Sequence, residues 1–150
     1  MKQTILRPIN EIILHCTGTF ESQVVTMADI KRWHVAERGW GNVGYHYVID
    51  KDGTVLQGRA LGQQGAHCKG HNATSIGVCY IGGLEDGSAK PKDTRTPEQK
   101  EAMFALVRSL LDDFGLRIEN VHCHNEYSNR ACPCFSKEEF AKEYWRWLLR

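Results

Sequence analysis

The sequence predicts an α/β fold, a single domain in which helices flank a central mixed β-sheet. Two short apolar runs, residues 12–16 and 75–80, are typical of strands that are buried on both faces of a sheet. Two amphipathic segments, residues 96–115 and 136–148, carry the start signals and periodicity of helices that pack on such a sheet. At 150 residues the chain suits one domain, so we expect residues 1–150 to form a single domain.

The amino-terminal part reads as a strand followed by a helix. Residues 12–16 are apolar on both faces, which predicts a strand in the middle of the sheet. Thr26 and Asp29 then form a capping-box pattern, which predicts the start of a helix. We expect this helix to end near Gly39.

The next segment reads as a β-hairpin followed by a long loop. Residues 45–51 alternate between two sets of side chains, which predicts a strand with Tyr45, Tyr47 and Ile49 on one face. The Asp-Gly pair that follows signals a two-residue turn into a second strand. The Gly-rich residues 58–74 show no periodicity and predict a surface loop that lines a cleft.

The carboxyl-terminal half reads as strand, helix, strand and helix. After the strand at 75–80 and an exposed loop, Thr96 caps a helix that Gly115 ends. Residues 118–123 predict a parallel strand that returns beside an earlier one by a right-handed crossover. Ser136 caps the last helix, with an aromatic residue before it that is placed to pack on the first turn.

Charge and hydropathy exclude several classes of partner. Lys and Arg number 19 against 18 Asp and Glu, so no attraction to nucleic acid or to an anionic membrane is expected. No run approaches the length of a transmembrane helix, and residues 1–11 lack the apolar segment of a signal peptide. We therefore expect a protein that is cytoplasmic as synthesised, without stable membrane insertion, and whose six cysteines are free or metal-bound.

The segment at residues 121–135 is dense in side chains that bind metals. Zinc accepts imidazole nitrogen and thiolate sulfur, and a catalytic site uses three protein ligands so that water takes the fourth position. Two ligands from this segment leave a third to be found, and His15 is the best candidate because a buried strand delivers it to the sheet edge. The residue types alone leave open which members of the segment bind: His122, Cys123, His124, Cys132 or Cys134.

The same residues carry a resemblance to a known family. Four parts of the chain resemble the zinc-dependent N-acetylmuramoyl-L-alanine amidases of the phage lysozyme type. They are His15 after its apolar strand, GWGNVGYHYVIDKDGTV at 39–55, AHCKGHNATSIGVCYIGG at 66–83 and HNEYSNRACPCF at 124–135. That family shares its fold with the peptidoglycan recognition proteins. The motifs run over nearly the whole chain in the family's order and spacing, so the resemblance implies an amidase-like fold and activity.

Carried over residue by residue, the resemblance implies one Zn²⁺ per chain, held by His15, His124 and Cys132. It also implies that Tyr45 is the catalytic tyrosine beside the metal. Many phage members have Lys two positions before the cysteine ligand, whereas this chain has Arg130. Because the pKa of Arg is too high for proton transfer, we expect Arg130 to stabilise the oxyanion by its charge.

The implied reaction is hydrolysis of the amide between N-acetylmuramic acid and the L-alanine of the peptidoglycan stem peptide. Zinc would polarise the carbonyl and activate water, and Tyr45 would stabilise the oxyanion. His67, Lys69 and Asn72 are candidates for binding the substrate. The interpretation that they are solvated polar residues of the loop is equally good. Trp40 either stacks on substrate or anchors its loop in the core.

Other functions compete with the hydrolase. A recognition module would bind peptidoglycan or a muropeptide without cutting it, and it remains the alternative. A nucleobase deaminase is rejected, because Pro133-Cys134 lacks the second cysteine of the required P-C-x-x-C motif. The resemblance implies a phage or prophage endolysin that acts on the cell wall after release. We expect a monomer, and a regulatory protein partner stays open because some phage amidases also bind a polymerase.

Overall fold

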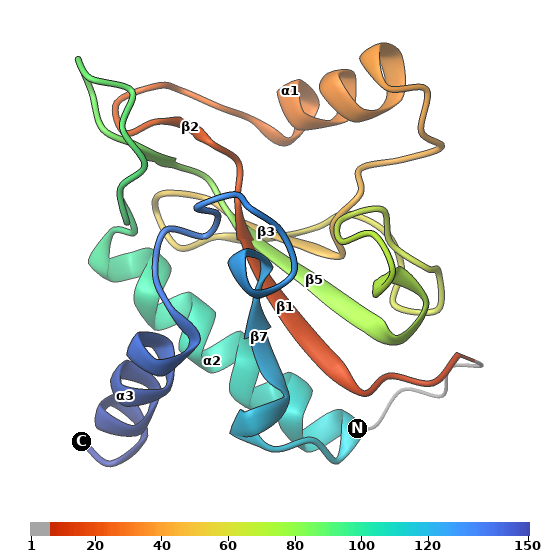
Figure 1. Cartoon of the computed structure of the whole chain (residues 1–150), viewed down its shortest axis with the longest axis vertical. Coiled ribbons are helices and arrows are strands. Elements are labelled where there is room, and N and C mark those ends of the chain that lie inside the picture. The colour runs from red at the N-terminus through yellow and green to blue at the C-terminus, as the bar shows by residue number, and fades with distance from the viewer. Residues whose placement is uncertain (1–6) are drawn as a thin grey trace.

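The computed structural model describes residues 7–150. Residues 1–6, which belong to the segment expected to lack a signal peptide, lie outside the described residues. Its central feature is a five-stranded sheet in the order β4-β3-β5-β1-β7 (Figure 1). All neighbouring strands are parallel except β3 and β4. The predicted mixed sheet is therefore confirmed. Its strands are β1 (Glu11–Cys16), β3 (Tyr47–Ile49), β4 (Val55–Gln57), β5 (Ser75–Tyr80) and β7 (Val121–Cys123).

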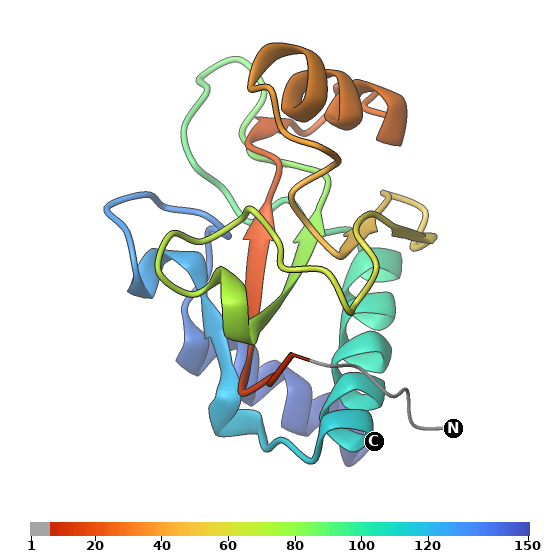
Figure 2. The same cartoon turned by 90° about the vertical axis from the view of Figure 1, so that its right-hand side faces the viewer.

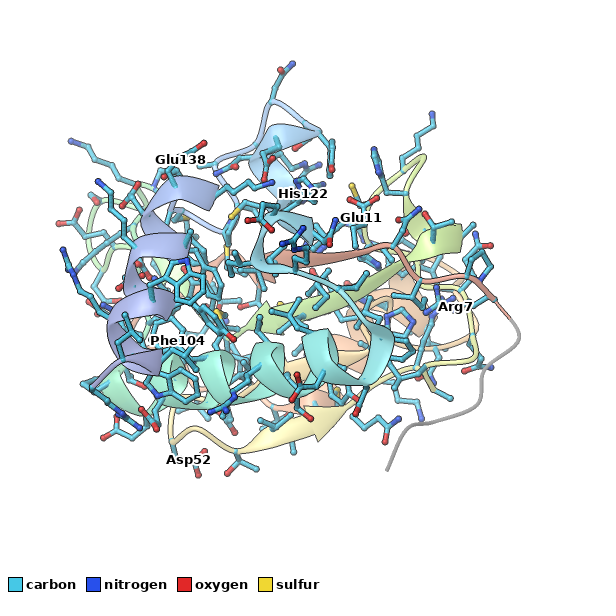
Figure 3. The ribbon with its side chains drawn as sticks, turned by 90° about the horizontal axis from the view of Figure 1, so that it is seen from below. Arg7, Glu11, Asp52, Phe104, His122 and Glu138 are labelled. Carbon is cyan, nitrogen blue, oxygen red and sulfur yellow. The ribbon has the colours of Figure 1, made fainter. Side chains whose placement is uncertain are left out.

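The sheet separates a large core from a smaller one. On one face, helices α2 (Pro97–Phe114) and α3 (Lys137–Leu148) cover the sheet, and Figure 2 shows α2 running along its side. Phe104 lies where these two helices meet, with its ring 5.6 Å from that of Phe140 (Figure 3). On the other face, α1 (Met27–Lys31) packs near the end of the sheet with Ile30 buried against Val48 and its neighbours. Among residues 7–150, no helix is both long and apolar enough to cross a bilayer.

The predicted helix ends are confirmed. The Thr26, Thr96 and Ser136 side chains each accept a hydrogen bond from the backbone N–H three residues on. Each forms a reciprocal capping box, which satisfies amide groups that the first turn leaves free. Gly115 ends α2 with φ 63°, a left-handed conformation that glycine adopts without a side-chain clash.

The strand expected at residues 45–51 is shorter than predicted. Regular strand pairing begins only at Tyr47. The alternation of side chains therefore does not extend to Tyr45, which was expected on the same face of the sheet as Tyr47. Tyr47 and Ile49 pack on the α2 face, whereas Tyr45 packs on the opposite face. The expected common face for Tyr45 and Tyr47 was therefore wrong, and the difference brings Tyr45 to the side of the sheet on which His15 lies.

Three other local predictions differ from the structure. The hairpin turn has three residues rather than two, because the Asp50 N–H donates to the Thr54 carbonyl at 2.9 Å and Gly53 takes φ 89°. Helix α1 continues as a π-helical segment, Arg32–Glu37. The strand predicted at 118–123 begins with a 3-10 turn, Ile118–Asn120.

Two segments expected to be exposed loops contribute to the interior. In the loop at 58–74, Leu61, His67 and Cys68 are buried. The loop at 82–95 contains β6 (Gly83–Leu84), which pairs with β2 (Thr19–Phe20) in a small second sheet. At its end Arg95 is buried, with ion pairs to Asp93 and Glu143 at 2.9 and 2.7 Å.

Candidate metal centre

Three predicted ligands converge at the carboxyl ends of two neighbouring strands. His15 is near the end of β1, and His124 directly follows β7, which pairs with β1 in parallel. The loop after His124 returns Cys132 to the same place. One donor atom from each residue lies within 4.8 Å of the others, and His15 Nδ1 is 3.9 Å from Cys132 Sγ. The sheet therefore brings His15 together with an imidazole and a thiol that lie far from it in the sequence.

The donor set fits a zinc ion. Zinc binds imidazole nitrogen at ~2.0–2.1 Å and thiolate sulfur at ~2.3 Å in tetrahedral geometry, which separates the donors by roughly 3.3–3.6 Å. His15 Nδ1 and Cys132 Sγ are 3.9 Å apart, somewhat more than the tetrahedral value, and the donor atoms of all three residues lie within 4.8 Å of one another. Two nitrogens and one sulfur also leave a fourth tetrahedral position open, as in catalytic sites.

Burial keeps the two imidazoles neutral. Burial, with His67 and His124 close by, holds the pKa of His15 well below its usual value. Burial and then the Arg130 guanidinium lower the pKa of His124. A lowered histidine pKa means that the ring is unprotonated at neutral pH, which is the form that binds metals.

Cys132 receives a hydrogen bond from the backbone of β1. The Cys16 N–H donates to Cys132 Sγ at 3.1 Å, and the Cys16 side chain points to the α2 face of the sheet. This contact was not anticipated, because no local pattern relates residues 116 positions apart.

The other members of the 121–135 segment have different partners. His122 Nδ1 lies 3.0 Å from a Glu126 carboxylate oxygen, and Cys123 is buried on the α2 face. The Cys134 thiol donates to the Gly83 carbonyl at 3.4 Å. None of these three belongs to the convergent group, and all six cysteines are free.

Tyr45 lies beside the convergent group. Its ring centroid is 5.2 Å from that of His15. Burial raises the pKa of Tyr45 well above its usual value, and nearby cysteines add to the effect. The hydroxyl is therefore protonated at neutral pH and is able to donate a hydrogen bond.

An open cleft of about 1030 Å³ contains this group and the other predicted site residues. Arg130 is exposed at the cleft, as is Lys69. Trp40 also lines it, with its ring 4.7 Å from that of His34. The roles of these side chains toward a substrate stay predictions.

Two of the predicted substrate contacts are engaged within the protein. The Asn72 side-chain oxygen accepts hydrogen bonds from the backbone N–H groups of His67 and Cys68, both at 2.9 Å. His67 is 9% exposed, and its two ring nitrogens lie 2.8 Å from His15 Nε2 and 3.1 Å from Ser75 Oγ. His67 lines the cleft, but its burial does not fit the alternative interpretation as a solvated loop residue.

Comparisons with known proteins agree with this geometry. The family model described as N-acetylmuramoyl-L-alanine amidase matches residues 6–135. The endolysin of Escherichia phage T7 is 39% identical over 134 residues, which are 89% of this chain and 83% of that protein. The endolysin of Klebsiella phage KP32 is 37% identical over 136 residues, 91% of this chain and 85% of that protein. Among solved structures, N-acetylmuramoyl-L-alanine amidase LysC from Clostridium intestinale URNW has a TM-score of 0.72 and 29% identity, over 85% of this chain and 77% of that one.

Proposed function

Because the chain belongs to the N-acetylmuramoyl-L-alanine amidase family, we propose that the convergent residues hold one zinc ion for peptidoglycan hydrolysis. The activity is cleavage of the amide between N-acetylmuramic acid and the L-alanine of the stem peptide. The observation that carries the zinc proposal is the meeting of His15, His124 and Cys132 within 4.8 Å at the cleft. Nitrogen and thiolate donors in this number favour zinc over Mg²⁺ or Ca²⁺, which prefer oxygen ligands.

The metal and its ligands have separate tasks. When bound, zinc supplies Lewis-acid chemistry, because it polarises a carbonyl and lowers the pKa of water. His15 and His124 contribute no charge as neutral ligands, and the Cys132 thiolate contributes one negative charge. The site as a whole therefore keeps a net positive charge toward the amide carbonyl.

Tyr45 is proposed to donate its hydroxyl hydrogen bond to the carbonyl oxygen as that oxygen gains negative charge. The raised pKa keeps the proton on the hydroxyl, and the partly buried position makes its orientation stable before substrate arrives. A preorganised donor of this kind stabilises the transition state more than the ground state.

Arg130 is proposed to act through its permanent charge at the cleft. It lies close enough to His124 to lower the pKa of that ring. Since a guanidinium does not lose its proton at working pH, Arg130 attracts the oxyanion and transfers no proton. Lys69 and Trp40 are proposed to contact the glycan or the stem peptide, because both line the cleft.

The phage relatives support an endolysin role, and we propose that the protein acts on the cell wall after release from the cell.

The test is an amidase assay on purified muropeptides. We expect the protein to release stem peptides with a free L-alanine amino group, to lose this activity after treatment with a chelator, and to regain it with added zinc. Binding of muropeptides without any release would instead support the recognition module. Release that persists after complete metal removal would contradict the zinc proposal.

A further inference from the structure

A second histidine lies directly behind the proposed zinc ligand on β1. His15 Nε2 and His67 Nδ1 are 2.8 Å apart, and the two rings are perpendicular with centroids separated by 4.9 Å. Both rings are buried, with 1% and 9% of their surface exposed. The contact is therefore a hydrogen bond shielded from water.

The distance alone fits either direction of donation, and the positions of the protons follow once the proposed metal is bound to His15. Because His15 Nδ1 faces Cys132 Sγ, it is the nitrogen that would bind the metal, and it carries no proton. The proton of His15 is then on Nε2, which donates to His67 Nδ1. His67 must carry its own proton on Nε2, which donates to Ser75 Oγ at 3.1 Å. One consistent chain of donors thus runs from the metal ligand to Ser75.

Two glycines leave the space that the His67 ring occupies. A Cβ atom on Gly77 would lie 2.7 Å from two carbons of that ring, and one on Gly65 would lie 2.5 Å from Cδ2. Such distances are shorter than van der Waals contact, so both positions need glycine for the ring to fit. Asn72 holds the backbone amide of His67 from the other side. Two glycines and the Asn72 side chain therefore fix the position of the His67 ring.

We propose that His67 is a positioning residue that acts through His15, and this inference rests on the proposed zinc site. It fixes the tautomer of His15 and aims Nδ1 at the metal. Partners that orient metal-bound histidines are usually carboxylates, backbone carbonyls or water. His67 is instead a neutral acceptor, so it orients the ligand without adding negative charge behind it. The full positive charge of the zinc–thiolate site is thereby kept for the substrate carbonyl.

A matched pair of substitutions separates the hydrogen bond from the packing. In His67→Asn, the side-chain oxygen occupies nearly the place of Nδ1 and can accept from His15. In His67→Leu, a side chain of similar size has no acceptor. Zinc affinity is measured by competition with a chromophoric chelator, and we expect His67→Leu to bind about 10–100-fold more weakly than the parent. His67→Asn should retain most of the parent's affinity.

The visible spectrum of the cobalt-substituted proteins gives a second readout. We expect the cobalt bands of His67→Leu to shift because His15 is misaligned, whereas those of His67→Asn stay close to the parent's. Thermal unfolding of the metal-free variants serves as the stability control. If His67→Leu does not fold, His67→Ala takes its place against His67→Asn.

The outcomes distinguish this inference from the zinc proposal itself. Equal zinc affinity and equal spectra for the parent and His67→Leu would overturn the positioning role. Equal losses in the Asn and Leu variants would also overturn it, because the acceptor atom would then be irrelevant. A parent protein that binds no zinc would contradict the proposed function instead.

Discussion

Single side chains set the chemistry of this cleft, and burial sets their protonation. The same desolvation that holds the pKa of His15 well below its usual value raises the pKa of Tyr45. The first effect frees a nitrogen for the metal, and the second keeps a proton on the hydroxyl. The two neighbouring rings therefore have complementary roles at the same pH.

Removal of the Tyr45 hydroxyl should lower catalysis and leave the metal in place. We expect Tyr45→Phe to reduce kcat by about 10²–10³-fold, the usual cost of one oxyanion donor. Zinc content should equal that of the parent, because the phenol is not a ligand. Steady-state kinetics on a muropeptide and metal analysis measure both quantities.

Tyr47→Phe is the matched control for this substitution. Tyr47 is two residues away but packs on the α2 face, so its variant should keep the parent's kcat. A Tyr45→Phe enzyme with parental kcat would show that the hydroxyl has no part in the reaction.

The sequence predicted the three residues of the candidate metal site, but not the contacts that surround them. His15, His124 and Cys132 were singled out because of their chemistry and the family's spacing, and the fold places them together. The contact of His67 with His15 escaped prediction, because it joins a loop to a strand 52 positions away. Its only trace in the sequence is the pair of glycines that make room for the ring, Gly65 and Gly77.

Helix α2 is tied to the sheet by a buried polar side chain. Gln99 is fully buried, and its amide donates to the Ile49 and Ile81 carbonyls, both at 3.1 Å. Its side-chain oxygen accepts from the Thr96 N–H at 2.9 Å. One residue thus completes the helix cap and satisfies carbonyls at the ends of two strands.

Replacement of Gln99 should therefore destabilise the fold. We expect Gln99→Leu to lower the free energy of unfolding by about 1–3 kcal/mol, because the Ile81 carbonyl and the Thr96 N–H lose their hydrogen bonds to this side chain. Urea unfolding followed by circular dichroism measures the change. Glu98→Ala, at an exposed position in the same turn, should cost less than about 1 kcal/mol. Equal stability of Gln99→Leu and the parent would refute this role for the amide.

Elements with local signals were predictable, and those that depend on distant partners were not. The caps at Thr96 and Ser136 need only neighbouring residues, so the sequence predicts them and the structure confirms them. The pairing of β2 with β6 joins segments about 64 positions apart, and nothing local marks either one. Tyr45 was placed on the wrong face because strict alternation was extended beyond the first paired residue, Tyr47.

Several buried histidines make the whole molecule sensitive to acid. Burial lowers the pKa of His34 to about 4, with a smaller contribution from Arg38. Burial likewise lowers the pKa of His46 to about 4. His34 Nδ1 accepts the Gly44 N–H at 2.8 Å, which requires an unprotonated nitrogen. The folded state therefore holds these rings neutral where the unfolded chain would protonate them.

The metal-free protein should lose stability as the pH falls. Between pH ~6.5 and about 4, the unfolded state binds a proton at each of these histidines and the folded state does not, so the free energy of unfolding rises with pH. Each histidine contributes at most ~1.4 kcal/mol per pH unit. Urea unfolding in the presence of a chelator at pH 7 and pH 5 measures the difference.

His34→Asn provides the control for this dependence on pH. The asparagine oxygen can still accept the Gly44 N–H but does not titrate, so the variant should show a flatter slope than the parent. A parent whose stability is constant or increases on acidification over this window would contradict the assignment of neutral buried histidines.

One comparison decides whether the three converging side chains are the catalytic centre. Zinc content and peptidoglycan cleavage are measured for the parent and for His124→Ala. We expect about one zinc per purified parent chain and release of stem peptides. His124→Ala should lose both, while His122→Ala, two residues away and outside the convergent group, should keep both. If His124→Ala retained its zinc and its cleavage, the proposed metal centre would be wrong.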